Sequence, residues 1–151
     1  MPRSDDWDID APFVTAFKVG DEHIDRLEHM NNAVYLTFME QAAWHHTEAL
    51  GIGWQTYVDL DAVCVVHRHE LDYLMPAYHG DELEVATWIA ENDGRLKMWR
   101  AFQMRRTSDG RTIFRARSQY VTVKMSNGRA CRMPQSFVGT YRAAPATKAG
   151  G

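Results

Sequence analysis

Cysteine is scarce in this sequence, and its scarcity excludes one class of protein. The 151 residues include only Cys64 and Cys131, which do not form a CxxC pair. Two thiols are too few for the disulfide framework of a small secreted domain, so we expect both to be reduced. The first ten residues contain four aspartates and no apolar run, unlike a signal peptide. We therefore expect a cytoplasmic protein.

Long hydrophobic runs and blocks of like charge are also missing. The longest strand-like apolar run, Ala62–Val66, is far shorter than the ~18 residues that cross a bilayer. The formal net charge is −3, and no five or six like charges follow one another. These absences argue against a membrane span and against a nucleic-acid partner.

What is present is the composition of one globular domain. Apolar residues make up 45% of the chain and charged residues 25%, which are ordinary proportions for a folded protein. The length also fits a single domain. We expect a flexible segment at residues 1–11, one domain at residues 12–142 and a disordered tail at residues 143–151.

Apolar periodicity predicts one long helix and five strands. Between Ala33 and Leu50 apolar residues recur every three or four positions without Gly or Pro, which indicates an amphipathic helix. Gly51 is a suitable residue for its end. Five other segments are rich in β-branched and aromatic residues, and the last three connections contain turn residues. The expected strands are Phe13–Val19, Ala62–Leu74, Glu82–Ala90, Leu96–Thr107 and Arg111–Lys124.

This order of elements predicts an α+β fold. A helix this apolar must be buried along much of its surface, and an antiparallel sheet that curls around it buries it. The last three strands are expected to form a meander, because their connections are short. Exposed sheet edges are commonly covered by pairing with a second subunit. We therefore expect a homodimer at least.

The densest group of reactive side chains lies just before the helix, in the sequence HIDRLEHMNNAVY of residues 23–35. A carboxylate at a helix N-terminus lies beside free N–H groups that stabilise a developing oxyanion. These are the groups that acyl transfer to water requires. Ordinary helix capping selects similar residue types, so the residues alone leave both interpretations open.

The run from Asp25 to Tyr35 resembles the signature of the 4-hydroxybenzoyl-CoA thioesterase family. In that signature an aspartate and a Gly-His pair precede an Asn-Asn pair and a tyrosine. The resemblance extends over residues 13–134. Three further segments resemble the family in the expected order: Glu40–Ala43, Leu71–Ala77 and Gly80–Leu83.

The resemblance implies a hotdog fold, in which a five-stranded antiparallel sheet wraps around one long central helix. It also implies homodimers or homotetramers with active sites between subunits. The implied reaction is hydrolysis of acyl-CoA or acyl-carrier-protein thioesters without a metal, and coenzyme A is part of the substrate rather than a cofactor. Asp25 matches the catalytic aspartate, and the N–H near Asn32 matches the donor to the thioester carbonyl. Tyr35 is expected in the pocket wall, and His29 and Asn31 in the same substrate-binding segment.

Two residues depart from the family pattern. Glu28 stands where a glycine usually precedes the histidine, and His23 stands where an aspartate commonly lies two residues before the catalytic one. A missing glycine changes the loop only if that position requires a positive φ.

Several residues offer alternatives. Glu40 is an alternative catalytic acid near the acyl pocket, although a surface glutamate is commoner. The histidine pairs His45-His46 and His67-Arg68-His69 suggest a metal, but no third ligand follows at a known spacing. We expect no metal, and we expect His67 or His69 to line the acyl tunnel.

Five arginines are candidates for contacts with the phosphates of coenzyme A, although solvated strand-end charges are the commoner role. They are Arg68, Arg105, Arg106, Arg129 and Arg132. Two other functions remain open on the same fold. One is a hydratase or dehydratase of acyl thioesters, whose usual signature differs from the Asp25 to His29 spacing. The other is an acyl-thioester-binding module without catalysis.

Overall fold

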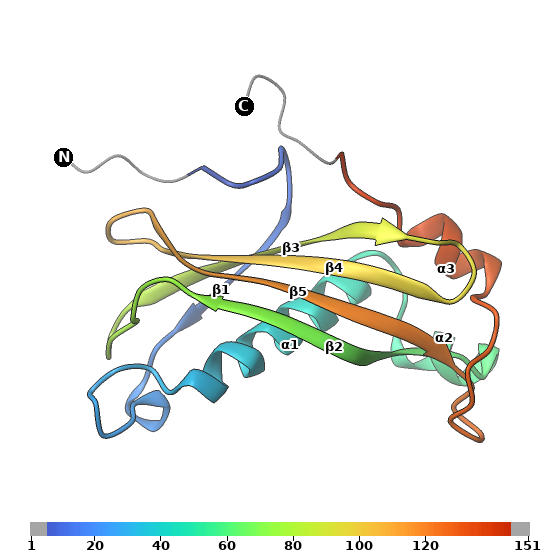
Figure 1. The fold of residues 1–151 in the computed structure, drawn as a ribbon, viewed down its shortest axis with the longest axis horizontal. Coiled ribbons are helices and arrows are strands. Elements are labelled where there is room, and N and C mark those ends of the chain that lie inside the picture. Colours follow the sequence, from blue (N-terminus) through green and yellow to red (C-terminus); the bar gives the residue numbers. More distant parts are fainter. Residues whose placement is uncertain (1–5, 146–151) are drawn as a thin grey trace.

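Five strands form one antiparallel sheet in the computed structural model, which describes residues 6–145. The strand order is β1-β3-β4-β5-β2, so β3, β4 and β5 form the expected meander and β1 and β2 are the edges (Figure 1). All five strands predicted from the sequence are confirmed to within two residues at each end. The strands are β1 (Phe13–Lys18), β2 (Val63–Tyr73), β3 (Glu82–Asn92), β4 (Lys97–Arg106) and β5 (Arg111–Val123).

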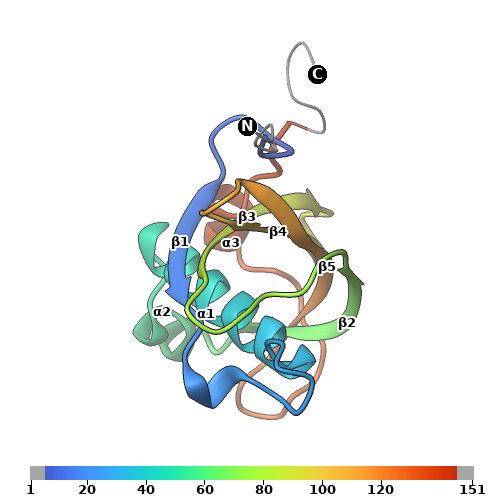
Figure 2. The same ribbon diagram turned by 90° about the vertical axis from the view of Figure 1, so that its left-hand side faces the viewer.

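The long helix α1 (Asn32–Ala49) lies in the concave face of the sheet. Seen from the end of the molecule, the strands curl around it from β1 on one side to β2 on the other (Figure 2). Its buried face carries Tyr35, Phe38, Met39 and Ala42, whose three- and four-residue spacing places them on one side of a helix. The hotdog fold and the α+β class predicted from the sequence are confirmed.

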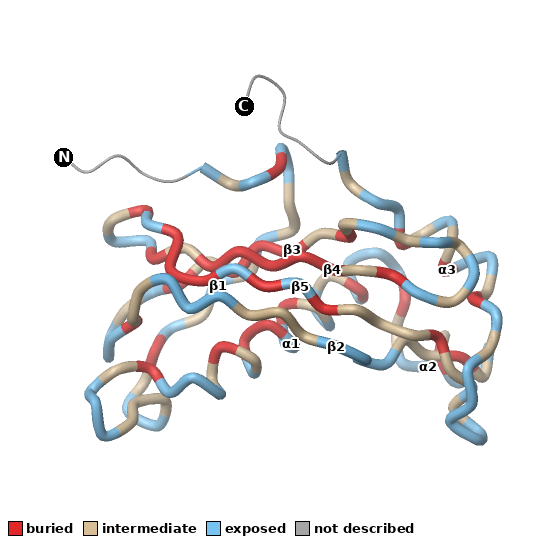
Figure 3. Tube along the Cα trace, viewed as in Figure 1, coloured by how far each residue is buried: buried red, intermediate tan, exposed pale blue. Residues whose placement is uncertain are grey.

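The core lies between α1 and the middle of the sheet. Burial is greatest along β3 and β4, whereas the edge strand β2 is largely accessible (Figure 3). Side chains of a strand point alternately to its two faces. Met98, Phe102 and Met104 of β4 accordingly lie in the buried clusters of the concave side. Arg100 occupies the inward position between Met98 and Phe102.

Three short helices complete the fold: η1 (Asp21–His23), α2 (Trp54–Leu60) and α3 (Gln135–Thr140). The short helical turn expected after Pro134 is confirmed as α3. The segment after Gly53 was expected to be a plain connection, and this expectation is wrong. α2 forms there because Tyr57 packs edge-on against Phe137 of α3, in a second core cluster beyond the end of α1.

The segment before β1 contacts the sheet. Both carboxylate oxygens of Asp8 accept hydrogen bonds from the Arg115 guanidinium at 2.8 and 3.0 Å, and the guanidinium of Arg105 lies 4.3 Å from the ring centre of Trp7. Residues 1–5 and 146–151 lie outside the described residues, so the expected N-terminal flexibility and C-terminal disorder stay predictions. Within residues 6–145, none of the helices combines the length and apolar composition of a membrane-spanning segment.

Candidate active site

The loop before α1 holds Asp25 in a tight turn. The Asp25 N–H donates to the carbonyl of His29, and the Glu28 N–H donates to the carbonyl of Asp25, both at 3.0 Å. The Asp25 carboxylate accepts a hydrogen bond from the Leu27 N–H at 2.9 Å. Glu28 has a φ of 62°, so the position where the family usually carries glycine does require left-handed backbone. The glutamate adopts it at a cost of about 1 kcal/mol relative to glycine.

The first turn of α1 leaves one N–H available. The side-chain oxygen of Asn31 caps the helix by accepting from the Ala33 N–H at 2.9 Å, and the Asn31 carbonyl accepts from the Val34 N–H at 2.9 Å. The N–H of Asn32 has no acceptor among residues 6–145. It therefore remains free to donate to an oxygen that becomes negative beside the positive end of the helix dipole. Asn31 serves as the cap, and Asn32 supplies the free donor.

A cavity of about 180 Å³ lies at this end of the helix. The Tyr35 hydroxyl accepts a hydrogen bond from the Ala77 N–H at 3.2 Å, and the Tyr73 hydroxyl donates to the carbonyl of Asn32 at 2.9 Å. Burial raises the pKa of both phenols, so they stay protonated. Asp25 is not among the lining residues. These are His29, Met30, Asn32, Tyr35, Tyr73, Leu74, Met75 and Pro76.

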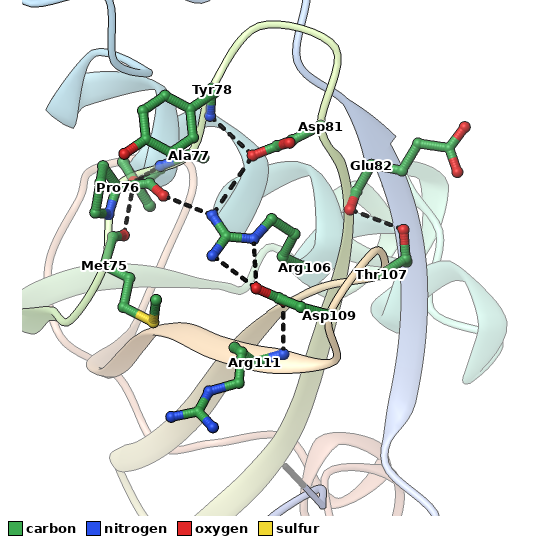
Figure 4. Close-up of polar contacts among 11 residues, drawn as sticks. Met75, Pro76, Ala77, Tyr78, Asp81, Glu82, Arg106, Thr107, Asp109 and Arg111 are labelled. Carbon is green, nitrogen blue, oxygen red and sulfur yellow. Dashed lines mark hydrogen bonds and ion pairs between the residues drawn. The ribbon is translucent and has the colours of Figure 1, made fainter. Parts of the chain in front are cut away.

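One buried arginine holds the β2–β3 loop (Figure 4), of which Leu74, Met75 and Pro76 line this cavity. Arg106 donates to the carbonyl of Pro76 at 2.9 Å and to the carboxylate of Asp109 at 2.9 and 3.2 Å. Its guanidinium also lies 3.7 Å from the carboxylate of Asp81. In the same loop, the Ala77 carbonyl accepts from the N–H of Met30 at 2.7 Å. Arg106 thus connects the β4–β5 hairpin to the loop that contacts the start of α1.

Arg106 also corrects an expectation. A solvated charge at a hairpin end was expected, but the residue is 8% exposed and its charge is paired with Asp109. Arg105 forms an ion pair with Glu84 at 3.1 Å. Both arginines are therefore paired inside the fold, Arg105 with a carboxylate of the neighbouring strand β3 and Arg106 with a carboxylate of its own hairpin turn. Arg68, Arg129 and Arg132 are exposed and stay candidates for phosphate contacts.

A second, larger cavity of about 310 Å³ lies between the later turns of α1 and the edge strand β2. Glu40 belongs to this cavity, eight residues after Asn32, which is about 12 Å along a helix. The other lining residues are mostly apolar or aromatic. They are Ala43, Trp44, Thr47, Tyr57, Cys64, Val65, Val66, Met98, Arg100, Tyr120 and Tyr141.

Arg100 lies at the buried side of this larger cavity and is 2% exposed. Its Nη1 atom lies 2.7 Å from Nδ1 of His46 and 3.3 Å from Oγ1 of Thr87, and its Nη2 donates to Oγ1 of Thr47 at 3.4 Å. Burial and the neighbouring guanidinium lower the pKa of His46 to about 4, so its ring is a neutral acceptor. Sequence reasoning missed Arg100. The available signal was a cation at an inward position of a strand that is otherwise apolar inside.

The histidines that suggested a metal are dispersed. His45 contacts Thr15 at 3.2 Å, His46 contacts Arg100, and Nδ1 of His69 lies 2.6 Å from the hydroxyl of Ser118. His67 is exposed at an irregular point of β2 and lines neither cavity. Among the described residues, no group of three or more His, Cys, Asp or Glu side chains has the arrangement of a metal site.

The predicted site residues therefore fall into separate groups. His29, Asn32 and Tyr35 meet in the smaller cavity, with Asn31 at the cap beside them and Asp25 in the preceding turn. Glu40 lies in the larger cavity. The first group supplies a carboxylate, a free amide donor and a recess near one helix end, which are the parts used in acyl transfer to water.

Comparison with known proteins adds a family. The sequence model of the Thioesterase-like superfamily matches residues 19–140. The long-chain acyl-CoA thioesterase FadM of Escherichia coli (strain K12) is 32% identical over 82 residues, which are 54% of this chain and 61% of that protein. The alignment thus spans less than two thirds of the length of that relative.

Solved structures share the fold. A hypothetical protein from Aquifex aeolicus has a TM-score of 0.79 at 18% identity, over 87% of this chain and 100% of that chain. A 1,4-dihydroxy-2-naphthoyl-CoA thioesterase from Synechocystis has a TM-score of 0.77 at 15% identity, over 87% and 96% of the two chains. A hypothetical protein from Staphylococcus aureus in complex with CoA has a TM-score of 0.79 at 19% identity, over 93% and 90%. At these identities the likeness establishes the fold.

Proposed function

We propose that this chain, which belongs to the thioesterase-like superfamily, hydrolyses acyl-CoA thioesters to a free acid and coenzyme A. The observation that carries the proposal is the free N–H of Asn32 at the start of a buried helix, seven residues after Asp25. A carboxylate and an amide donor are sufficient for this reaction. The proposal therefore requires no metal and no cofactor.

Asp25 is the catalytic carboxylate in this proposal. It either attacks the thioester carbonyl, expels the thiolate and forms a mixed anhydride that water hydrolyses, or removes a proton from a water that attacks the carbonyl. In both routes negative charge develops on the carbonyl oxygen, and the Asn32 N–H donates to that oxygen. The products are the acid and the free thiol in either case.

Of the other predicted residues, those in the two cavities bind the substrate. His29 and Tyr35 form the recess beside the reacting carbonyl, and Asn31 holds the first turn of α1 in place. Glu40 lies farther along α1 in the larger cavity, where the acyl group extends, whereas His67 is exposed, lines neither cavity and has no role in the proposal. The name of the FadM relative supports coenzyme A as the carrier, and an acyl-carrier protein is the alternative carrier.

A homodimer or homotetramer in the cytoplasm is part of the proposal. The edge strand β2 is eleven residues long and exposes Val65, Val66 and Tyr73 by 41%, 39% and 42%. A long exposed edge strand is a pairing surface for a second chain. Cys64 and Cys131 are both unpaired thiols, as expected in a reducing compartment.

The test is thiol release from a panel of aliphatic and aromatic acyl-CoAs by the natural chain and its Asp25→Asn and Glu40→Gln variants. Asp25→Asn preserves the shape of the side chain and removes its charge, so we expect kcat to fall by roughly 10²- to 10⁴-fold. Glu40→Gln is the matched control, because it makes the same change in the larger cavity, and it should retain most of the turnover.

Each contrary outcome has a separate meaning. Loss of activity only in Glu40→Gln moves the catalytic acid to α1 and leaves the reaction intact. Water addition to an unsaturated acyl-CoA without thiol release identifies a hydratase. Binding of acyl-CoAs without any turnover identifies a module that binds its ligand and does not cleave it.

A further inference from the structure

A row of polar side chains crosses the concave face of the sheet beneath α1. Arg100 of β4 is the cross-strand partner of Ser118 of β5, and Ser118 is the partner of His69 of β2. Directly opposed residues point to the same face of a sheet, and Arg100 points inward because it contacts His46 and Thr47 of α1. The row therefore runs from Arg100, which lines the larger cavity, through Ser118 to His69 on the edge strand β2.

The charge of Arg100 is not neutralised by the chain. It forms no ion pair with a described residue, and its Nε has no hydrogen-bond partner among them. It forms hydrogen bonds with His46, Thr47 and Thr87, and its guanidinium lies 6.0 Å from the ring centre of Tyr120. All four neighbours are uncharged. A buried guanidinium without an anion is strongly unfavourable, since water no longer solvates the charge. An anion within the cavity would complete its coordination.

The cavity wall does not supply that anion. Glu40 is the only carboxylate among the described residues that line the cavity, and it is exposed and forms no ion pair with Arg100. Trp44, Tyr57 and Tyr120 provide flat apolar walls instead. Such walls suit a hydrocarbon chain, and the buried cation at one end suits a negatively charged terminus.

We propose that the larger cavity receives the end of the acyl group that lies away from the thioester, and that this end carries a carboxylate which pairs with Arg100. This inference rests on the proposed thioesterase function and narrows its substrate class to coenzyme A thioesters of dicarboxylic acids. A methyl-ended chain fills the same walls but leaves the guanidinium without an anion. Arg100 is thus the residue that selects the substrate, and it takes no part in cleavage.

The test compares pairs of acyl-CoAs of equal chain length that end in a carboxylate or in a methyl group. We expect the natural chain to favour the carboxylate-ended member by roughly tenfold to hundredfold in kcat/KM, the range of a hydrogen bond to a charged group. The advantage should be largest at the chain length that reaches Arg100. A hydroxyl-ended series of the same lengths separates charge from simple hydrogen bonding, and a preference for that series overturns the proposal.

Arg100→Met should abolish the carboxylate preference, measured as the ratio of kcat/KM between the carboxylate-ended and the methyl-ended member of each pair. Arg100→Lys keeps the charge but loses the planar fork, and it should keep part of the preference. The control is Arg117→Met on the opposite face of the sheet, where the arginine is partly exposed and stacks on Trp99 at 4.5 Å. This variant should retain the full preference of the natural chain.

The outcomes separate this proposal from the thioesterase function. Hydrolysis of methyl-ended chains in preference to carboxylate-ended ones at every length overturns the role of Arg100 and leaves the function standing. Absence of all hydrolysis overturns the function, and calorimetry with the same pairs then shows whether the cavity still selects a carboxylate. If Arg100→Met does not fold, two other results test the proposal. They are the ratio of kcat/KM between carboxylate-ended and methyl-ended substrates in the natural chain, and the decrease of that ratio in Arg100→Lys.

Discussion

Among single residues, His46 makes the stability of the fold depend on pH. Its ring accepts from buried Arg100 and stacks on Phe13 at 5.0 Å, and its pKa in the folded chain is about 4 against an ordinary value of 6.5. Between these two values the unfolded chain binds a proton that the folded chain does not bind. The free energy of unfolding therefore falls as the pH falls from 6.5 to 4, by at most about 1.4 kcal/mol per pH unit.

Urea denaturation at about pH 7, 6 and 5 measures this dependence. The comparison is with His46→Gln, whose amide oxygen still accepts from Arg100 but does not titrate. The difference in the free energy of unfolding between the natural chain and the variant should shrink as the pH falls. If the free energy of unfolding changes with pH by the same amount in both proteins, His46 does not contribute to the pH dependence.

At the scale of residues, the sequence predicts features that depend on near neighbours and misses those that depend on distant ones. The Asp25 turn and the asparagine cap were predictable, because they depend on neighbours within eight residues. The positive φ of Glu28 was identified as a question and was answered only by the backbone. The burial of Arg100 and Arg106 was missed, because it depends on Thr87 and on the loop of Pro76 and Asp81, which lie far away in the chain, although Asp109 is only three residues after Arg106.

At the scale of elements, the start of α1 depends on Asn31. Asn31→Ala removes the acceptor of the Ala33 N–H, and we expect the free energy of unfolding to fall by about 1 kcal/mol. Asn31→Asp retains an oxygen at the cap and should unfold near the natural midpoint. Urea denaturation of the three proteins measures the effect, and equal stability of Asn31→Ala and the natural chain would contradict it.

Long elements could be predicted from the sequence pattern, whereas the short helix α2 could not. α1 was predictable because eighteen residues repeat the apolar spacing several times, and the strands were predictable because turn residues separate them. α2 has only seven residues and one buried side chain, Tyr57, so its periodicity is too short to read. It packs against a segment some eighty residues later, through the ring of Phe137 in α3 and the 2.8 Å contact between the hydroxyls of Tyr57 and Tyr141, the residue that follows α3.

At the scale of the whole molecule, the edge strand β2 predicts how subunits assemble. Val65→Lys places a positive charge on that edge in both subunits, which opposes their pairing. We expect the dimer dissociation constant to rise by about tenfold or more. Val14→Lys makes the same change on the other edge strand, at a similar exposure of 37%, and should leave the dimer intact.

Light scattering behind size-exclusion chromatography measures both variants. A natural chain that is monomeric at micromolar concentrations contradicts the assembly outright.

The fold and the superfamily were predictable from the sequence, because strand order, helix length and linked motifs agree. Assembly was not, since an exposed edge does not specify the register in which a second chain would pair with it.

The larger cavity has one more consequence. α1 packs closely against β1 and β3, whereas on the side of β2 the interior is left about 310 Å³ short of side chains. In the proposed complex, an acyl chain occupies that volume and makes the contacts that a missing side chain would have made. Its binding free energy then adds to the free energy of unfolding. While it is bound, the substrate completes the packing of the hydrophobic core. Each turnover removes that packing, and the next substrate restores it.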